Sequence, residues 1–396
     1  MPAKSRFAVA GAAAAVLTVT LAGCGPSSKP AAPGRAASSA VADSAMPGRS
    51  SVAPLSSPIS SPATPSSGPV STDVLAAARI FLKRYVANDG RVVRHDQGGD
   101  VVSEGQAYGL LISELAGSAD TTRTIWSWTA KHLQRTDGLL SWHADSNGDV
   151  LDKESASDAD TLAAYALLRY AGPDADTLHA DGRRIADGVL AHESVQVSGA
   201  PVIAAGPWAI TQPVVVNPSY WMPGVDNELA ALTGNGDWAM AAKKAVELVD
   251  EITNQGQLLP PDWAALQGGQ FIATAAPGGS PGTQYGLDAQ RIPVWFATSC
   301  AANARDLAAS WWRNVLSHAN RSNAIALTIQ GDVVNHSQNA LSMLAGAAAA
   351  SAANDPSAFA SLVERAKKQA ANAPTYYGDA WLALGQALLD GNLTRC

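Results

Sequence analysis

From about residue 73 to the end of the chain, apolar residues recur with the helical period of 3.6, and turn residues separate the runs. Strand-like alternation is scarce and limited to two short pieces in long loops, 195–197 and 214–216. The pattern therefore predicts an all-α domain, with helices over 73–87, 103–117, 123–133, 157–171, 178–192, 227–232, 238–253, 288–300, 307–319, 337–352, 357–371 and 378–389.

Cap residues agree with several of these helices. Ser103, Ser157 and Ser337 are predicted as N-caps, and Gly117 and Gly172 as stops. Short links alternate with long loops rich in Gly, Pro and Trp, which favours a toroid of helical hairpins whose inner helices point their N-terminal ends at a groove. An α-solenoid is the alternative, although no fixed repeat of about 34 or 40 residues is present.

The N-terminus is predicted to be a targeting segment. Lys4 and Arg6 precede an apolar, Ala-rich run over 7–22, which is too short and too weakly flanked to be interpreted first as a membrane span. It ends in Leu-Ala-Gly-Cys at 21–24, which is similar to a bacterial lipobox, the signal for cleavage before Cys24 and lipidation of that cysteine. The alternative is an ordinary secretory signal. Both predict a location outside the cytoplasm, lipid-anchored to the membrane or secreted.

Residues 25–72 form a Ser-, Pro- and Ala-rich segment with almost no large apolar side chains. Such a segment cannot bury enough surface to offset its ordering entropy, so a disordered tether is predicted. Residues 73–396 then form the folded domain. In an oxidising compartment Cys300 and Cys396 could pair, but one buried and one terminal thiol would fit equally well.

Bulk composition excludes some partners and leaves room for others. The 396 residues are 47% hydrophobic with a net charge of -7, which allows a large core and argues against nucleic acid as a partner. The 11 Trp against 5 Phe are typical of surfaces that stack sugar rings, although core packing explains many tryptophans as well.

The segment 103–109, Ser-Glu-Gly-Gln-Ala-Tyr-Gly, places a carboxylate at the start of an apolar helix. Glu104 falls in the first turn, where the helix dipole favours its charged form. Gly105 and Gly109 are expected to leave a groove beside it. Such a carboxyl suits a general acid facing a bulky ligand. From this segment alone, a helix-dipole partner is the simpler interpretation of Glu104.

Two more segments repeat this logic. Ala-Ser-Asp-Ala-Asp at 156–160 places two acids in the first turn of another apolar helix, where one can serve the groove while the other braces the scaffold. In the segment 285–295, Asp288 is predicted at a helix start with Arg291 one turn later. An arginine at that spacing can keep a carboxylate ionised and oriented, which a general base needs.

Together these segments resemble the family 8 glycoside hydrolases. The resemblance covers roughly residues 73–396, and it includes 103–109, 156–160 and Leu-Asp-Ala-Gln-Arg-Ile-Pro at 287–293. The loop Asn-Pro-Ser-Tyr-Trp at 217–221 and Tyr-Tyr-Gly-Asp at 376–379 fit the same pattern. The resemblance implies an (α/α)6 barrel that hydrolyses β-1,4-linked glycans such as cellulose, lichenan, chitosan or xylan with inversion.

Site roles follow from the resemblance. It implies that Glu104 is the general acid and Asp288 the general base, although some members place the base in another loop. It implies that Asp158 binds and distorts the sugar ring, with Tyr220 and Arg291 lining that position. Inversion requires roughly 6.5–9.5 Å between the two catalytic carboxyls.

Substrate and partners follow from the same comparison. Trp142, Trp221 and Trp263 lie in or beside loops, so they are candidates for stacking sugars, with ordinary packing as the alternative. Cellulose or a related β-glucan is the favoured substrate. A chitosanase or xylanase of the same family, or a non-catalytic glycan-binding lipoprotein, are the alternatives. A monomer is expected, with membrane contact only through the lipid anchor.

No cofactor or metal is predicted. Asp-Ser-Asn-Gly-Asp at 145–149 resembles the start of a calcium loop, but Val150 stands where that loop needs glycine and Ala156 where it needs glutamate. The seven histidines do not have metal-ligand spacing.

Overall fold

The structure is a computed structural model that describes residues 69–394. The predicted signal peptide with Cys24, almost all of the predicted tether and Cys396 lie outside these residues. Cys300 takes part in a disulfide. Among the described residues, no helix combines the length and apolar character needed to cross a membrane.

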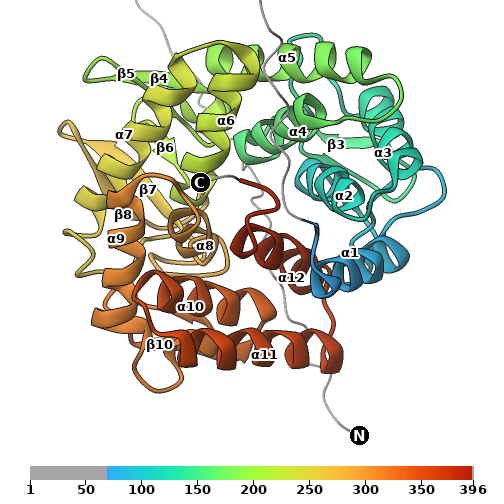
Figure 1. The fold of residues 1–396 in the computed structure, drawn as a ribbon. Helices are drawn as coiled ribbons and strands as arrows, with labels where there is room; N and C mark the ends of the chain where they lie inside the picture. Colours follow the sequence, from blue (N-terminus) through green and yellow to red (C-terminus); the bar gives the residue numbers. More distant parts are fainter. Residues whose placement is uncertain (1–68, 395–396) are drawn as a thin grey trace, which may run out of the picture. The chain divides into compact units, whose positions relative to one another are not determined.

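The described residues form a ring of α-helices (Figure 1). Their bounds are α1 (Thr72–Tyr85), α2 (Ser103–Leu115), α3 (Ala119–His132), α4 (Ser157–Arg169), α5 (Ala175–His192), α6 (Pro223–Thr233), α7 (Asp237–Ile252), α8 (Arg291–Ala297), α9 (Ala302–Trp311), α10 (Ala340–Ala352), α11 (Pro356–Asn372) and α12 (Tyr376–Leu389). The even-numbered helices form the inner layer, and the odd-numbered helices cover them, which makes an (α/α)6 barrel.

Composition separates the two layers. Most inner helices are buried along most of their length. In α10 small and aliphatic residues occupy every face, and the helix is buried continuously from Ala340 to Ala350. Outer helices such as α11 bury one stripe, at Leu362, Ala366 and Ala370. A helix that is apolar all round belongs inside, and an amphipathic one belongs at the surface.

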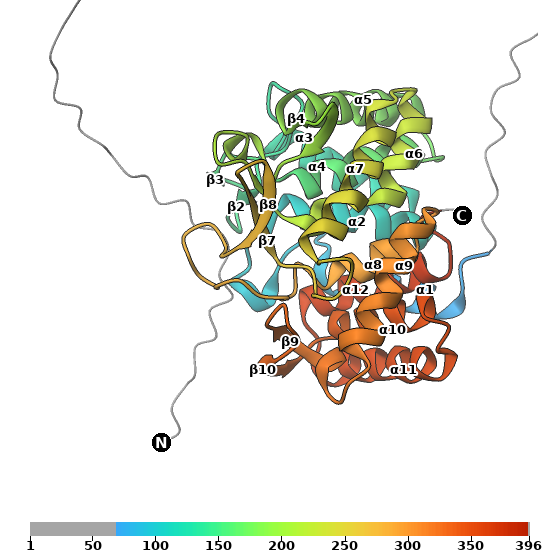
Figure 2. The ribbon, with the colours of Figure 1, turned by 90° about the vertical axis from the view of Figure 1, so that its left-hand side faces the viewer.

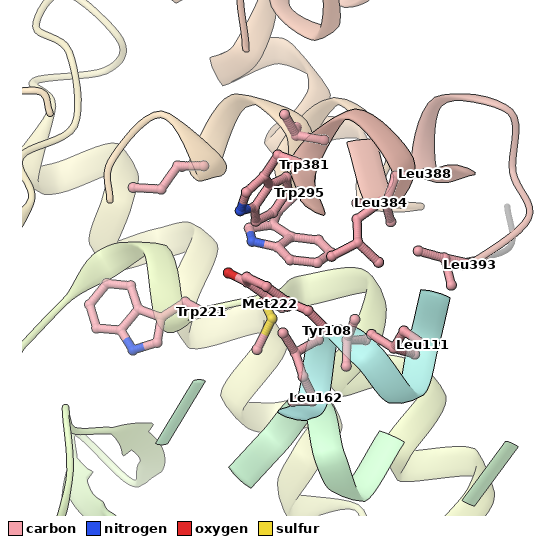
Figure 3. Close-up of a cluster of buried hydrophobic side chains, with 14 of the residues drawn as sticks. Tyr108, Leu111, Leu162, Trp221, Met222, Trp295, Trp381, Leu384, Leu388 and Leu393 are labelled. Carbon is pink, nitrogen blue, oxygen red and sulfur yellow. The ribbon is translucent and has the colours of Figure 1, made fainter. Parts of the chain in front are cut away.

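The centre of the ring is filled by aromatic side chains from three inner helices (Figure 3). The ring of Trp381 lies edge-on to Tyr108, with centroids 5.9 Å apart, and edge-on to Trp295, at 5.4 Å. Edge-to-face pairs of this kind are favoured by the ring quadrupole. The barrel interior is therefore a packed core, and ligands must bind at an end of it.

Short antiparallel strands gather at one end of the barrel, on the left of Figure 2. They pair as β1 (Val101–Val102) with β2 (His143–Ala144) and β3 (Val150–Asp152), β4 (Ser194–Val197) with β5 (Ala200–Ile203), β6 (Val215–Val216) with β7 (Trp263–Gln267) and β8 (Gln270–Thr274), and β9 (Ala324–Leu327) with β10 (Val333–Gln338). The two predicted pieces correspond to β4 and β6. The other strands were not predicted, because each is short and its extended conformation depends on hydrogen bonds to a partner strand.

The predicted caps are wrong in detail. Ser103 and Ser157 are the first residues of their helices and make no capping bond. Instead, Ser103 N donates to Trp142 O at 2.9 Å, and the Ser157 hydroxyl donates to Ala204 O at 2.6 Å. Both serines therefore fasten a helix start to a neighbouring loop.

Three other boundaries also differ. Ser337 lies in β10, and Asn339 caps α10 by accepting from Leu341 N at 2.9 Å. Gly172 does not end α4, which stops at Arg169. Gly117, by contrast, ends α2 as predicted: it follows the C-cap with a φ of 68°, and its N–H donates to Glu114 O at 2.9 Å. The helix predicted over 288–300 begins at Arg291 instead, so Asp288 lies in the preceding turn.

Candidate active site

The three predicted acids meet around one arginine. Arg291, the first residue of α8, has a side chain that is 2% exposed. Its Nη1 donates to Glu104 Oε1 at 3.0 Å and to Asp158 Oδ2 at 2.8 Å. Its Nη2 lies 3.5 Å from Asp288 Oδ1. Residues from α2, α4 and the turn before α8 are thus brought into one polar cluster, hereafter the carboxylate cluster.

The side chain of Glu104 lies at the start of α2 and is 21% exposed. One turn further on, the Tyr108 hydroxyl donates to Glu104 Oε1 at 2.9 Å. Burial raises the pKa of Glu104 to about 7, helped by the charges of Asp158 and Asp288 and opposed by Arg291 and the Tyr108 hydrogen bond. A carboxyl with such a pKa holds its proton at mildly acidic pH.

The acids of the second segment divide their roles as predicted. Asp158 is 5% exposed at its side chain and pairs with Arg291, while its Oδ1 accepts from Ala159 N at 2.8 Å. Burial raises the pKa of Asp158, and the Arg291 guanidinium opposes this. Asp160 points the other way, and its Oδ1 accepts from Leu140 N at 2.8 Å, which fixes the loop after α3.

Asp288 is the most exposed acid of the carboxylate cluster, with 38% of its side chain open to solvent. Asn217 Nδ2 donates to Asp288 Oδ2 at 2.9 Å, and Asn217 Oδ1 accepts from the Ser219 hydroxyl at 2.6 Å. The Ser219 oxygen in turn accepts from Arg291 Nη2 at 2.6 Å. Asn217 and Ser219 therefore orient both the acid and the arginine.

The predicted pairing of Asp288 with Arg291 is present, with 3.5 Å between Asp288 Oδ1 and Arg291 Nη2. Arg291 makes shorter contacts with Glu104 and Asp158. The spacing within the 285–295 segment does not reveal these two contacts, because both partners lie more than a hundred residues away.

The glycines of the first segment do not leave an open groove. A Cβ on Gly105 would lie 2.8 Å from the Tyr376 hydroxyl, and one on Gly109 would lie 2.7 Å from Val92 Cγ2. Both glycines allow neighbouring side chains to approach α2. The close approach at Gly105 places the start of α12 beside Glu104.

Aromatic rings extend from the carboxylate cluster. The Tyr220 ring lies 5.2 Å from Arg291 Cζ, Trp263 lies 6.3 Å from Tyr220, and Trp208 lies 6.4 Å from Trp263. Trp208 is 37% exposed, whereas Trp263 is buried. Trp208 was not among the predicted residues, although its place after Gly-Pro in a long loop was a usable signal.

The three predicted stacking tryptophans differ, and Trp263 is buried between Tyr220 and Trp208. Trp142 is half-buried, and its ring stacks on the ring of His143 with the centroids 4.7 Å apart. Its backbone carbonyl accepts a hydrogen bond from Ser103 N. Trp221 is 2% exposed, and its indole nitrogen donates to Ile203 O at 2.8 Å (Figure 3). Trp221 therefore has no face free for a sugar, and its predicted stacking role is wrong.

In residues 69–394, no three His, Cys, Asp or Glu side chains are placed so that they could hold one metal ion. The 145–149 segment forms the turn between β2 and β3. Asp145 Oδ1 accepts there from Asn147 N at 2.8 Å and from Asp149 N at 3.0 Å.

Comparison with known proteins agrees with this geometry. The model of the glycosyl hydrolases family 8 matches residues 70–391. A "Probable endoglucanase" of Novacetimonas hansenii is 31% identical over 246 residues, covering 59% of this chain and 70% of that protein. Endoglucanase C of Ruminiclostridium cellulolyticum is 28% identical over 271 residues, covering 65% of this chain but only 56% of that protein.

A solved structure extends the likeness to the fold. The endo-beta-1,4-glucanase CMCax of Acetobacter xylinum superposes with a TM-score of 0.65 at 25% identity, covering 81% of this chain and 98% of that one. Because the family model matches most of the chain, and the three acids of the family resemblance meet at one end of the barrel, the chain belongs to the glycosyl hydrolases of family 8.

Proposed function

We propose that the protein is an inverting endo-β-1,4-glucanase that acts on cellulose or a related β-glucan. The observation that carries this is the carboxylate cluster, in which one mostly buried acid with a raised pKa faces a more exposed acid across a shared guanidinium. The endoglucanase names of the relatives support the substrate class.

Glu104 is proposed as the general acid. Its pKa of about 7 leaves it protonated at mildly acidic pH. It can then give its proton to the departing glycosidic oxygen as the bond from that oxygen to the anomeric carbon breaks. Tyr108 and Arg291, which both contact Oε1, hold the carboxyl in place.

Asp288 is proposed as the general base. Its exposed carboxylate can accept a proton from a water whose oxygen forms the new bond to the anomeric carbon from the opposite face, which inverts the configuration. Glu104 and Asp288 contact different nitrogens of Arg291. The guanidinium therefore lies between the two carboxyls, and the proposal requires roughly 6.5–9.5 Å between them for the attacking water.

Asp158, Tyr220 and Arg291 are proposed to bind the sugar at the cleavage point. Asp158 and Tyr220 approach the same guanidinium from different elements. Trp142 and the exposed Trp208 are proposed to stack flanking sugar rings. The backbone of Trp142 contacts Ser103, the neighbour of Glu104, and Trp208 ends the row of rings that runs from Arg291 through Tyr220 and Trp263.

A substrate panel tests this proposal. Residues 70–396 would be assayed on soluble cellulose, lichenan, xylan and chitosan, with the product anomer followed by NMR. We expect β-glucan cleavage with an α-anomer formed first. Lack of cleavage on every substrate would refute the activity, a preference for chitosan or xylan would correct the substrate, and retention would refute the inverting assignment.

Variants test the roles of the two acids. E104Q and D288N should each lose hydrolysis while still binding a cello-oligosaccharide. Glu114 provides a matched control, since it is a mostly buried acid at the other end of α2, 3.5 Å from Arg169. E114Q should keep wild-type turnover. Wild-type turnover in E104Q would contradict the assignment of the acid.

We also propose that the domain acts outside the cytoplasm as a monomer, anchored by a lipid on Cys24 and connected to the anchor by the 25–72 tether. The lipobox-like segment and the composition of the tether support this. C24S should abolish incorporation of a labelled fatty acid in a bacterial host. Equal labelling of wild type and C24S would contradict the anchor.

A further inference from the structure

A mostly buried aspartate lies directly behind the turn that carries Asp288. Asp262 is 5% exposed and stands just before β7. Its Oδ1 accepts from Gly286 N at 2.9 Å and from Ala289 N at 2.9 Å. Its Oδ2 accepts from Gln284 Nε2 at 2.9 Å. All three donors belong to the segment 284–289.

These hydrogen bonds bracket Asp288 on both sides along the chain. Gly286 lies two residues before it and Ala289 one residue after it, so a single carboxylate oxygen fixes two peptide planes around the acid. The backbone adds a fourth link, because Asp262 N donates to Gln284 O at 2.8 Å. A turn held in this way cannot rotate about Asp288 without breaking several bonds to the same residue.

The fit between Asp262 and the turn requires glycine. A Cβ on Gly286 would lie 2.3 Å from Asp262 Oδ2. No positive φ is involved at this position, so close approach to the carboxylate is the constraint that remains. The Asp262 carboxylate therefore leaves no room for a side chain at position 286, and glycine at that position allows the carboxylate to reach the turn.

We propose that Asp262 is a positioning residue for the general base, holding the 284–289 turn so that the Asp288 carboxylate faces the attacking water. This rests on the proposed role of Asp288. The side-chain hydrogen bonds of Asp262 all go to the turn and none to the sugar-binding residues Asp158 and Tyr220, so it acts on the chemical step and leaves sugar binding largely intact. A displacement of about 1 Å at a reacting group can cost on the order of a hundredfold in rate.

Kinetics of Asp262 variants test the proposal. D262A, which removes three acceptor bonds, should lower kcat by about a hundredfold and change KM less than about threefold. D262N keeps an oxygen for the two backbone N–H groups, so it should recover kcat to within about tenfold of wild type. E114Q is the control for removing a mostly buried acid and should keep wild-type kcat and KM.

Binding and folding controls make the result decisive. Oligosaccharide affinity is measured by calorimetry and folding by near-UV circular dichroism. If D262A does not fold, G286A perturbs the same contact from the other side and should lower kcat at unchanged affinity. Wild-type kcat in the folded variant, or equal losses of kcat and affinity, would overturn the proposal.

The turnover of D288N, measured in parallel, separates the proposal that Asp288 is the general base from the proposal that Asp262 positions it. If D288N keeps its turnover, the base assignment fails, and the role of Asp262 in holding a base fails with it. If D288N is inactive while D262A has wild-type kcat, only the positioning role of Asp262 is refuted.

Discussion

Replacing Glu104 with glutamine should stabilise the protein increasingly as the pH rises, relative to wild type. In the unfolded chain Glu104 has its ordinary pKa of 4.5, whereas in the folded protein burial raises the pKa to about 7. Between these values the folded state holds a proton that the unfolded state has lost. Wild-type stability therefore falls as the pH rises from about 5 through 7, and glutamine, which does not titrate, removes this loss.

The magnitude follows from the size of the pKa shift. One pKa unit corresponds to about 1.4 kcal/mol, so the shift from 4.5 to about 7 amounts to about 3 kcal/mol. At pH 5, where wild-type Glu104 is mostly protonated, glutamine is close to isosteric with it. Any other effect of the substitution on stability should be nearly the same at every pH. Because the unfolded pKa of 4.5 lies below pH 5, a part of the change has already occurred there, so the difference in unfolding free energy between E104Q and wild type should grow by about 2–3 kcal/mol from pH 5 to pH 8.

Denaturant unfolding of both proteins at half-unit steps from pH 5 to pH 8.5 measures this difference. The tryptophan fluorescence of a chain with 11 Trp reports the transition. Glu114 gives an internal comparison, because burial raises its pKa to about 8. The corresponding gain for E114Q should begin over the same pH range, because the unfolded pKa is the same, but should continue about one pH unit higher and be larger. Parallel stability curves for wild type and E104Q would refute the reasoning.

Three further predictions concern single side chains. Y108F removes a hydrogen bond that lowers the pKa of Glu104. The alkaline limb of the profile of kcat/KM against pH should therefore move up by about half to one pH unit. An alkaline limb at the wild-type pH would contradict this prediction. W208A should raise KM for long cello-oligosaccharides about three- to tenfold without lowering the melting temperature, and an unchanged KM would exclude stacking there. W221A should destabilise the fold by about 3–5 kcal/mol in denaturant titrations, whereas a loss confined to KM would restore its predicted binding role.

Much of the barrel could be predicted from periodicity. Each of the twelve predicted ranges overlaps a helix of the described chain, because apolar spacing is a local property of the sequence. Boundaries were less accurate. Ser337 has the chemistry of an N-cap but lies in β10, where pairing with β9 decides the conformation, and Asn339 caps the helix instead. Tertiary contacts override local propensity at such positions.

The site was predicted in its residue types and only partly in its contacts. The acids of the carboxylate cluster could be identified because each stands at or near the start of an apolar inner helix. The bonds from Asp262 to the 284–289 turn were invisible, since they join segments whose register the sequence does not specify. The environments of Trp208 and Trp221 were equally hidden, because both stand in loops and only packing shows which one is exposed.

Charge balance in the carboxylate cluster explains why the pKa of Glu104 is raised. Arg291 supplies one positive charge to three carboxyls, so full ionisation would leave a net charge of -2 beside a mostly buried guanidinium. The shortest bond goes to Asp158, which is the least exposed acid and depends on the guanidinium most. Asp288 is 38% exposed and can be solvated by water and by the Asn217 amide. Glu104 shares the guanidinium and is mostly buried, so protonating it relieves repulsion at the smallest loss of solvation. The arrangement therefore favours the proton on Glu104, the proposed general acid, and leaves Asp288, the proposed general base, open to solvent.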